Sequence, residues 1–190
     1  MNDNNVKPVI EALLFVSDKP VLIEQMRNVF KEIESSLIRS ILEELKEEYY
    51  NSCRGMRIIE VAGGFQMVTA PELSASLKKF YQKPAERLRG ATLETLSIIA
   101  YKQPVTRMEI EGIRGVDISN IVRNLINKGL VRIAGRKKAP GRPFVYATTR
   151  QFLEYFGLKS LEELPKFEEF AKTEVGQNEA QQTAPTNRQG

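Results

Sequence analysis

Histidine is absent from the chain and cysteine occurs once, which excludes several kinds of chemistry. Among 190 residues, Cys53 is the single cysteine. Without histidine there is no Ser-His-Asp or Cys-His arrangement and no imidazole ligand for a transition metal. One cysteine cannot form an internal disulfide or a Cys-x-x-Cys motif. Carboxylate chemistry remains possible, but Glu43, Glu44, Glu47 and Glu48 have the spacing of a solvated helix face.

Long hydrophobic runs are also missing. No apolar stretch approaches the roughly 20 residues that a membrane-spanning helix needs. The first residues, "MNDNNVKPVIEALLFVSDKP", lack the basic region and the small-residue cleavage site of a signal peptide. Hydrophobic residues make up 42% and charged residues 27%, which is ordinary for a globular protein. We therefore expect a cytoplasmic protein that does not enter a membrane.

Positive charge is concentrated in one segment, although the whole chain carries only +4. Residues 1–50 hold 6 basic and 10 acidic side chains, net −4, and residues 151–190 hold 4 and 7, net −3. Residues 51–86 hold 5 and 3, net +2, whereas residues 87–150 hold 13 and 4, net +9. Such a basic segment suits a nucleic acid or an acidic protein partner, and it suits an inert basic surface equally well.

Helical spacing of apolar residues predicts three helices in the first half of the chain. Their stripes are Val6, Ile10, Leu13 and Leu14; Leu22, Met26 and Val29; and Ile38, Ile41, Leu42, Leu45 and Tyr49. Ser35 or Ser36 is the expected N-cap of the third helix. Two extended runs joined by Gly63-Gly64 then predict a β-hairpin, and "PELSASLKKF" predicts a short helix with Pro71 near its first turn.

The second half repeats this order. "TLETLSIIAY" and "VTRMEIEGI" predict two helices, and a third runs from an N-cap at Asp117 to an αL cap at Gly129. "LVRIA" and "FVYATT" predict a second hairpin, and "RQFLEYF" predicts a closing helix. Ser160 and Glu163 predict a capping box over one further turn, which Pro165 ends.

Three helices followed by a two-stranded wing form a winged-helix domain, so we predict two such domains in tandem. The fold class is mainly α with small β-hairpins (α+β). We place the N-terminal domain at 1–83, a linker at 84–91, the C-terminal domain at 92–168 and a disordered tail at 169–190. Pro84 and Gly90 punctuate the linker, and residues 173–190 have too little apolar content to fold.

The stretch "GRKKAPGRPFVYATT", residues 135–149, has three interpretations: a phosphate loop, a basic finger for DNA, or the turn of a hairpin. A Walker-type loop places four residues between its glycines, then Lys and a hydroxyl residue, and it opens a helix. Here five residues separate Gly135 from Gly141, Arg142 and Pro143 follow, and a strand comes next. This excludes the phosphate loop and leaves the wing of the second domain.

Two interpretations remain open for the polar surface of the second domain. In a winged helix the third helix enters the major groove of DNA, and here it offers Ser119, Asn120, Arg123, Asn124, Asn127 and Lys128. The wing carries Arg136, Lys137, Lys138 and Arg142, which are candidates for contact with DNA or an acidic partner. The alternative is a solvated wing whose edge is merely kept charged. The acidic third helix of the first domain fits a protein partner better than a second DNA-reading domain.

An aromatic and aliphatic cluster follows the second wing. Its members are Phe152, Tyr155, Phe156, Leu158, Leu161 and Leu164. Such a cluster can form an exposed docking groove, but more often it packs a C-terminal helix onto its own domain, which is what we expect here.

Residues 88–165 closely resemble the signature region of the segregation and condensation protein B (ScpB) family. The resemblance lies in "LETLSIIAYKQPVTRMEIEGIRG" and "GRPFVYATTRQFLEYFGLKSLEELP", and the weaker runs "EALLF" and "GGFQMVT" extend it into the first domain. It implies a non-enzymatic subunit of the bacterial condensin-like SMC–kleisin complex, with no cofactor, no metal and no catalytic residue. The implied roles are chromosome condensation and partition in the cell cycle and cell division, in the nucleoid-associated part of the cytoplasm.

The resemblance also implies the partners. Members of the family form homodimers, largely through the first winged-helix domain, and bind the central region of the kleisin ScpA, which links them to the SMC ATPase; contact with DNA would be indirect or weak. An amphipathic kleisin helix would lie in an apolar groove of the second domain, for which the candidates are Leu93, Leu96, Tyr101 and Phe156. The alternative function is a winged-helix DNA-binding transcriptional regulator.

Overall fold

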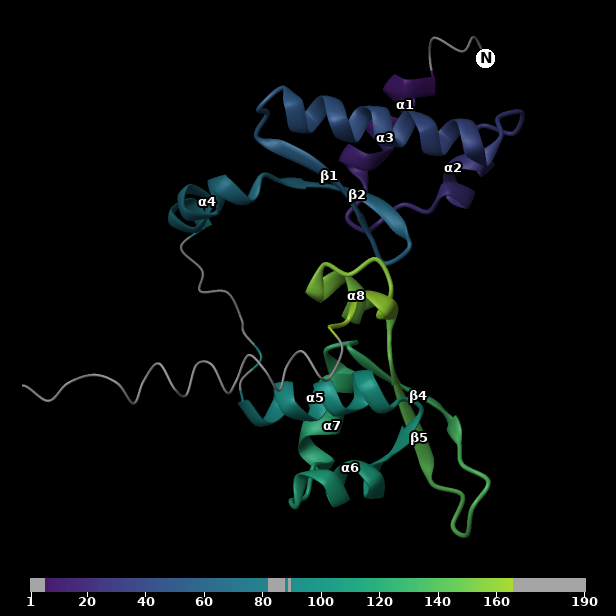
Figure 1. The fold of residues 1–190 in the computed structure, drawn as a ribbon, viewed down its shortest axis with the longest axis vertical. Helices are drawn as coiled ribbons and strands as arrows, with labels where there is room; N and C mark the ends of the chain where they lie inside the picture. The colour runs from purple at the N-terminus through teal and green to yellow at the C-terminus, as the bar shows by residue number, and fades with distance from the viewer. Residues whose placement is uncertain (1–5, 82–87, 89, 166–190) are drawn as a thin grey trace, which may run out of the picture.

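The computed structural model describes residues 6–81, 88 and 90–165. The predicted tail at 169–190 and most of the predicted linker at 84–91 lie outside the described residues. Within the described part, two groups of helices each carry an antiparallel hairpin, as Figure 1 shows. The predicted class, mainly helical with small hairpins in a winged-helix arrangement, is confirmed.

The first module contains α1 (Val6–Val16), α2 (Ile23–Val29), α3 (Ser35–Asn51), β1 (Met56–Val61), β2 (Gly64–Thr69), the 3-10 turn η2 (Pro71–Leu73) and α4 (Ser74–Tyr81). The predicted stripes of the three helices supply most of one buried cluster, to which Ile58 and Phe65 add the hairpin's inner face. Leu22 and Val29 are the exceptions: Leu22 is the N-cap of α2 and lies outside that cluster, and Val29 is 48% exposed. The order of elements matches the prediction from helical and strand periodicity.

The second module contains α5 (Gly90–Lys102), β3 (Val105–Thr106), α6 (Arg107–Arg114), α7 (Ser119–Asn127), β4 (Val131–Arg136), β5 (Phe144–Thr148), α8 (Arg150–Phe156) and the 3-10 turn η3 (Leu161–Glu163). A second buried cluster gathers Leu96, Ile99, Ile110, Leu125 and Phe152. Gly129, with φ of 68°, ends α7, and the N–H of Leu130 donates to the carbonyl of Leu125 as in a Schellman motif. The predicted αL cap is confirmed.

The hairpin turn of the first module was predicted one residue too late. Val61 pairs with Gly64, so the two turn residues are Ala62 and Gly63, with φ of 50° and 71°. Positive φ at both positions belongs to the turn that matches the twist of two antiparallel strands. Gly64 instead opens β2, and there a side chain is excluded, because a Cβ would lie 2.7 Å from the carbonyl oxygen of Val21.

Two predicted helix starts and the bonding of one predicted capping box differ from the structure. Glu34, not Ser35 or Ser36, is the N-cap of α3, and Ile118, not Asp117, is the N-cap of α7. Asp117 still accepts the N–H of Ser119 at 2.6 Å, so its carboxylate serves the same end of the helix from one position earlier. At η3, Ser160 accepts the N–H of Glu162, and Glu163 accepts that of Lys159 rather than that of Ser160.

A short third strand was not predicted. Val105 and Thr106 pair with Tyr146 and Val145 of β5, so the second wing has the order β3-β5-β4. The run "VTRMEIEGI" therefore splits into a strand and helix α6, because Thr106 acts as the N-cap in a capping box with Glu109. The pairing of β4 with β5 shifts register between Ile133 and Gly135, and Ile133 is 48% exposed.

The two modules meet where the β1–β2 turn reaches the end of α8 (Figure 1). The N–H groups of Ala62 and Gly63 donate to the carbonyls of Leu158 and Lys159. On the other side of the turn, Arg150 donates to the carbonyl oxygen of Pro20 at 3.3 Å. These contacts between the two modules are backbone hydrogen bonds and a hydrogen bond from the charged side chain of Arg150.

Candidate partner-binding surfaces

The four basic residues of the second wing fall into two groups. Arg136 lies over the ring of Phe144, 4.0 Å from its centroid, and donates to the carbonyl of Arg142 at 3.0 Å. Lys137 is paired with Glu109 at 2.5 Å. Lys138 and Arg142 are exposed, and neither forms an ion pair with another described residue. Only these last two side chains are therefore available to an anion without breaking a contact of the wing.

Glu109 ties the wing to the start of α6. Besides Lys137, its carboxylate accepts the N–H and the hydroxyl of Thr106, each at 2.8 Å. The hydrogen bond from Lys137, followed by those from Thr106, lowers the pKa of Glu109 to about 2. The ammonium of Lys137 is thus already paired within the domain, so it is a poorer candidate for contact with a phosphate.

Helix α7 presents a polar face. Asn120, Arg123, Asn124 and Asn127 are exposed, whereas Ser119 and Lys128 are half-buried. Ser119 accepts a hydrogen bond from Arg107 at 2.8 Å, which holds that hydroxyl within the domain. Arg123 is the one charged residue among the nine of α7, which is less positive charge than is typical of a DNA-reading helix.

The four candidate groove residues do not share one environment. Leu93 on α5 and Phe156 on α8 are 41% and 40% exposed. Tyr101 is half-buried and donates its hydroxyl to the carbonyl of Pro165 at 2.6 Å. Leu96 is 1% exposed inside the second core, so it cannot contact a partner while that core is closed, and this assignment was wrong. Its place in the stripe of α5 showed burial but not what buries it.

The cluster after the second wing is divided in the same way. Phe152 is buried, and Leu158 and Leu164 pack against the second core, as expected. Tyr155, Phe156 and Leu161 remain 48%, 40% and 41% exposed. The rings of Tyr155 and Phe156 meet edge to face with centroids 5.1 Å apart. Half of the cluster packs its own domain, and the other half forms an apolar surface on α8 and η3.

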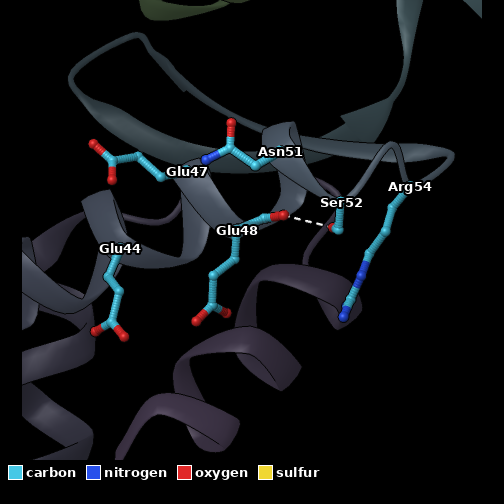
Figure 2. A pocket seen from close by; sticks show the side chains of 6 residues that line it. All are labelled: Glu44, Glu47, Glu48, Asn51, Ser52 and Arg54. Carbon is cyan, nitrogen blue, oxygen red and sulfur yellow. Dashed lines mark hydrogen bonds between the residues drawn. The ribbon is translucent and has the colours of Figure 1, made fainter.

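On the first module, the C-terminal half of α3 carries an acidic hollow. Figure 2 shows its lining residues, and its volume is about 660 Å³. Lys7 of α1 bridges Glu44 and Glu48 at 2.8 and 2.5 Å, and these bonds raise the pKa of Lys7. In Figure 2, Glu47 points away from the carboxylates of Glu44 and Glu48, and it has no ion pair with a described residue. The expected solvated helix face is what the structure shows, with one carboxylate left unneutralised.

An apolar groove lies beside the hollow, and the sequence interpretation missed it. Its volume is about 430 Å³, and Tyr50, Ile59, Val68 and Pro71 provide its apolar lining. Glu47 and Asn51 line both the groove and the acidic hollow, so the two form one surface. Tyr50 is 69% exposed. Ile59 and Val68 lie on the two strands, and their alternation was the available signal.

Metal and membrane features are absent from the part of the chain that the structure describes. Within residues 6–81, 88 and 90–165, no three Cys, Asp or Glu side chains converge as ligands of a metal ion would. None of the described helices combines the length and the apolar character that crossing a bilayer requires. The surfaces above are therefore the candidate functional features.

Comparison with known proteins identifies the family. The model of "Segregation and condensation complex subunit ScpB" matches residues 8–167. "Segregation and condensation protein B" of Syntrophotalea carbinolica is 43% identical over 172 residues, which cover 90% of this chain and 87% of that one. Its counterpart in Bacillus subtilis is 40% identical over 176 residues, with 93% and 89% covered.

Two solved structures are also similar in sequence. ScpB of Mycobacterium tuberculosis is 31% identical, and the match covers 83% of this chain and 98% of that one with a TM-score of 0.41. A dimer of an ScpB N-terminal domain complexed with an ScpA peptide is 29% identical, with 40% and 95% covered and a TM-score of 0.38. Both TM-scores are low, so the family is established by the sequence matches. On these matches, the chain belongs to the ScpB family of segregation and condensation complex subunits.

Proposed function

We propose that the chain is a non-enzymatic homodimer that binds the central region of a kleisin of the ScpA type and reaches an SMC ATPase through it. The N-terminal domain, residues 1–83, dimerises, and the C-terminal domain, residues 92–168, holds the kleisin. The site of action is the nucleoid, in the cytoplasm. Family membership supports the role in segregation and condensation. A dimer of an ScpB N-terminal domain has been crystallised with an ScpA peptide, which is a precedent for dimerisation and for ScpA binding, although there the peptide is complexed with the N-terminal domain.

The observation that carries the kleisin assignment is the apolar surface on α8 and η3. Tyr155, Phe156 and Leu161 stay at least 40% exposed, although the same segment buries Phe152. Large apolar side chains that remain exposed together mark an interaction site. An amphipathic helix would lay its apolar face against them, with Leu93 of α5 as a further contact.

Calorimetry with a peptide from the central region of a kleisin tests this assignment. We expect the double variant Leu93→Ser with Phe156→Ser to weaken binding at least tenfold, because two exposed apolar anchors are lost. Ile133→Ser is the matched control, since Ile133 is 48% exposed but lies on β4. Equal affinity of the double variant and the wild type would contradict the groove assignment.

A DNA-binding regulator is the second candidate function, and Lys138 and Arg142 favour it. Both are exposed on the wing and have no ion pair with a described residue. A regulator of this kind binds short duplex DNA by itself, with an affinity that falls steeply as salt rises. A subunit of an SMC–kleisin complex instead retains a kleisin and binds DNA weakly when alone.

A further inference from the structure

The 3-10 turn η2 and helix α4 carry an apolar stripe whose far end their own domain leaves exposed. Leu73, Leu77, Phe80 and Tyr81 follow the i, i+4, i+7, i+8 spacing of one helix face. Leu73 lies against Gly55, but Phe80 and Tyr81 at the far end are 78% and 67% exposed. Figure 1 shows α4 projecting from the side of the first module, away from α2. The stripe therefore contacts the first module at Leu73 and is exposed to solvent at Phe80 and Tyr81.

A helix of this length needs a surface to pack on. Isolated helices shorter than about 12 residues are marginal in water, and α4 has 8 residues, none of them buried. The rings of Phe80 and Tyr81 meet edge to face with centroids 5.3 Å apart, so they present one apolar unit. Such a helix is stable when its stripe is covered.

The surface described above on α3 and the hairpin combines an apolar groove with an exposed carboxylate at Glu47. We call it the α3 face: the groove lined by Tyr50, Ile59, Val68 and Pro71, together with Glu47 and Asn51 at its acidic border. Lys78 and Lys79 flank the aromatic end of α4 and, like Glu47, form no ion pair with a described residue. Lys46 and Arg57 also line the groove, but Lys46 is paired with Glu43 at 3.0 Å and Arg57 lies 3.9 Å from Glu72. Among the charged residues that line the groove, this leaves Glu47 without an ion pair to a described residue. A basic amphipathic helix can therefore place its apolar stripe in the groove and its lysines near Glu47.

We propose that the α3 face binds helix α4 of a second copy of this chain, with Phe80 and Tyr81 in the groove and the two lysines toward Glu47. The inference rests on the homodimer of the proposed function and assigns its interface. In a two-fold arrangement each copy gives one helix and receives one. The four aromatic side chains then bury about 600 Å² or more, a large part of the roughly 1,600 Å² of a standard interface.

Exchanging the charges tests the pairing. One variant, Lys78→Glu with Lys79→Glu, makes α4 acidic; the other, Glu47→Lys with Asn51→Lys, makes the α3 face basic. We expect each variant alone to dimerise at least tenfold more weakly than the wild type in sedimentation, because like charges meet at both contacts. Mixing the two variants restores opposite charges at both contacts, so we expect a heterodimer within about threefold of wild-type affinity.

A second variant tests the apolar part without changing charge. Phe80→Ser with Tyr81→Ser is expected to be monomeric but folded, because both side chains are exposed in the monomer, and its circular dichroism spectrum should lose no more helix than the 8 residues of α4. Phe15→Ser is the matched control, since Phe15 is 75% exposed on α1. Wild-type dimer mass in all α4 and α3 variants would overturn the inference, as would loss of kleisin binding with the dimer intact. A monomeric wild type would refute the homodimer itself, which is a separate result.

Discussion

The N–H of Ala62 donates a 2.8 Å hydrogen bond to the carbonyl oxygen of Leu158 and thereby joins the wing of the first module to the end of α8 in the second. The N–H of Gly63 makes the same kind of bond to Lys159 at 3.0 Å. The ammonium of Lys159 lies 3.8 Å from the carboxylate of Glu60. Since the exposed apolar residues of α8 and η3 flank this junction, it positions the proposed kleisin surface relative to the first module.

Reversing the charge at Lys159 should loosen the junction. In Lys159→Glu the carboxylate faces Glu60, so we expect the amides of Ala62 and Gly63 to exchange hydrogen about threefold to tenfold faster, the scale of an exposed ion pair. Lys159→Gln, which removes the attraction without adding repulsion, should fall between. The amide of Phe65, bonded to the carbonyl of Val21 within the first module, is the internal control. Equal exchange at Ala62 in all three proteins would refute the junction.

Gly64→Ala should destabilise the chain by about 1–3 kcal/mol, since its Cβ would meet backbone and not a movable side chain. The distance to the carbonyl oxygen of Val21 would be 2.7 Å. Gly112→Ala is the matched control: no atom lies within 4 Å of its Cβ, and in helix α6 the change should stabilise by about 0.5–1 kcal/mol. Urea unfolding measures the free energy of unfolding of both variants. An unchanged free energy in Gly64→Ala would show that the hairpin can shift away from Val21 at no cost.

Glu109 should make stability depend on pH in the acid range. Its pKa is lowered from 4.5 to about 2 in the folded chain, so its contribution is fully present above about pH 4.5 and is lost as pH falls toward 2. We therefore expect Glu109→Gln to be less stable than the wild type at pH 7 and equally stable near pH 2. Urea unfolding at several pH values measures the difference, and one that is constant with pH would contradict the assignment.

Two of the four wing residues should account for any affinity for DNA. Lys138→Ala with Arg142→Ala should lower the slope of log affinity against log salt by about 2, one unit for each phosphate contact. Lys137→Ala should change the slope less, because its ammonium is already paired with Glu109. Titration of a short fluorescent duplex at several salt concentrations gives the slopes. Equal slopes for the two variants would contradict this expectation, because they would mean that the ion pair with Glu109 does not keep Lys137 from contacting DNA.

Periodicity predicted what lies inside each module but not what lies between them. The end of α7 at Gly129 was predicted correctly, because a single residue in the αL conformation determines it. The turn at Ala62 was misplaced, because Gly63-Gly64 is the stronger turn signal and only the contact of Gly64 with Val21 reveals its other role.

The partner surfaces were harder to predict for a related reason. A stripe such as Leu93 and Leu96 shows which residues avoid water, yet one is exposed and the other is buried in the core. The groove at Tyr50, Ile59 and Val68 depends on how α3 packs against the hairpin, which no local pattern encodes. The spacing of the apolar residues of α4 can be found in the sequence, but only the folded chain shows that Phe80 and Tyr81 are exposed.

Native mass spectrometry of the chain co-expressed with the central segment of a kleisin tests the central claim most directly. The account predicts a complex with two copies of the 21.6 kDa chain and one kleisin segment. It also predicts a dimer of the chain when the kleisin is omitted. A monomer in both samples, or a chain that never retains the kleisin segment, would contradict it.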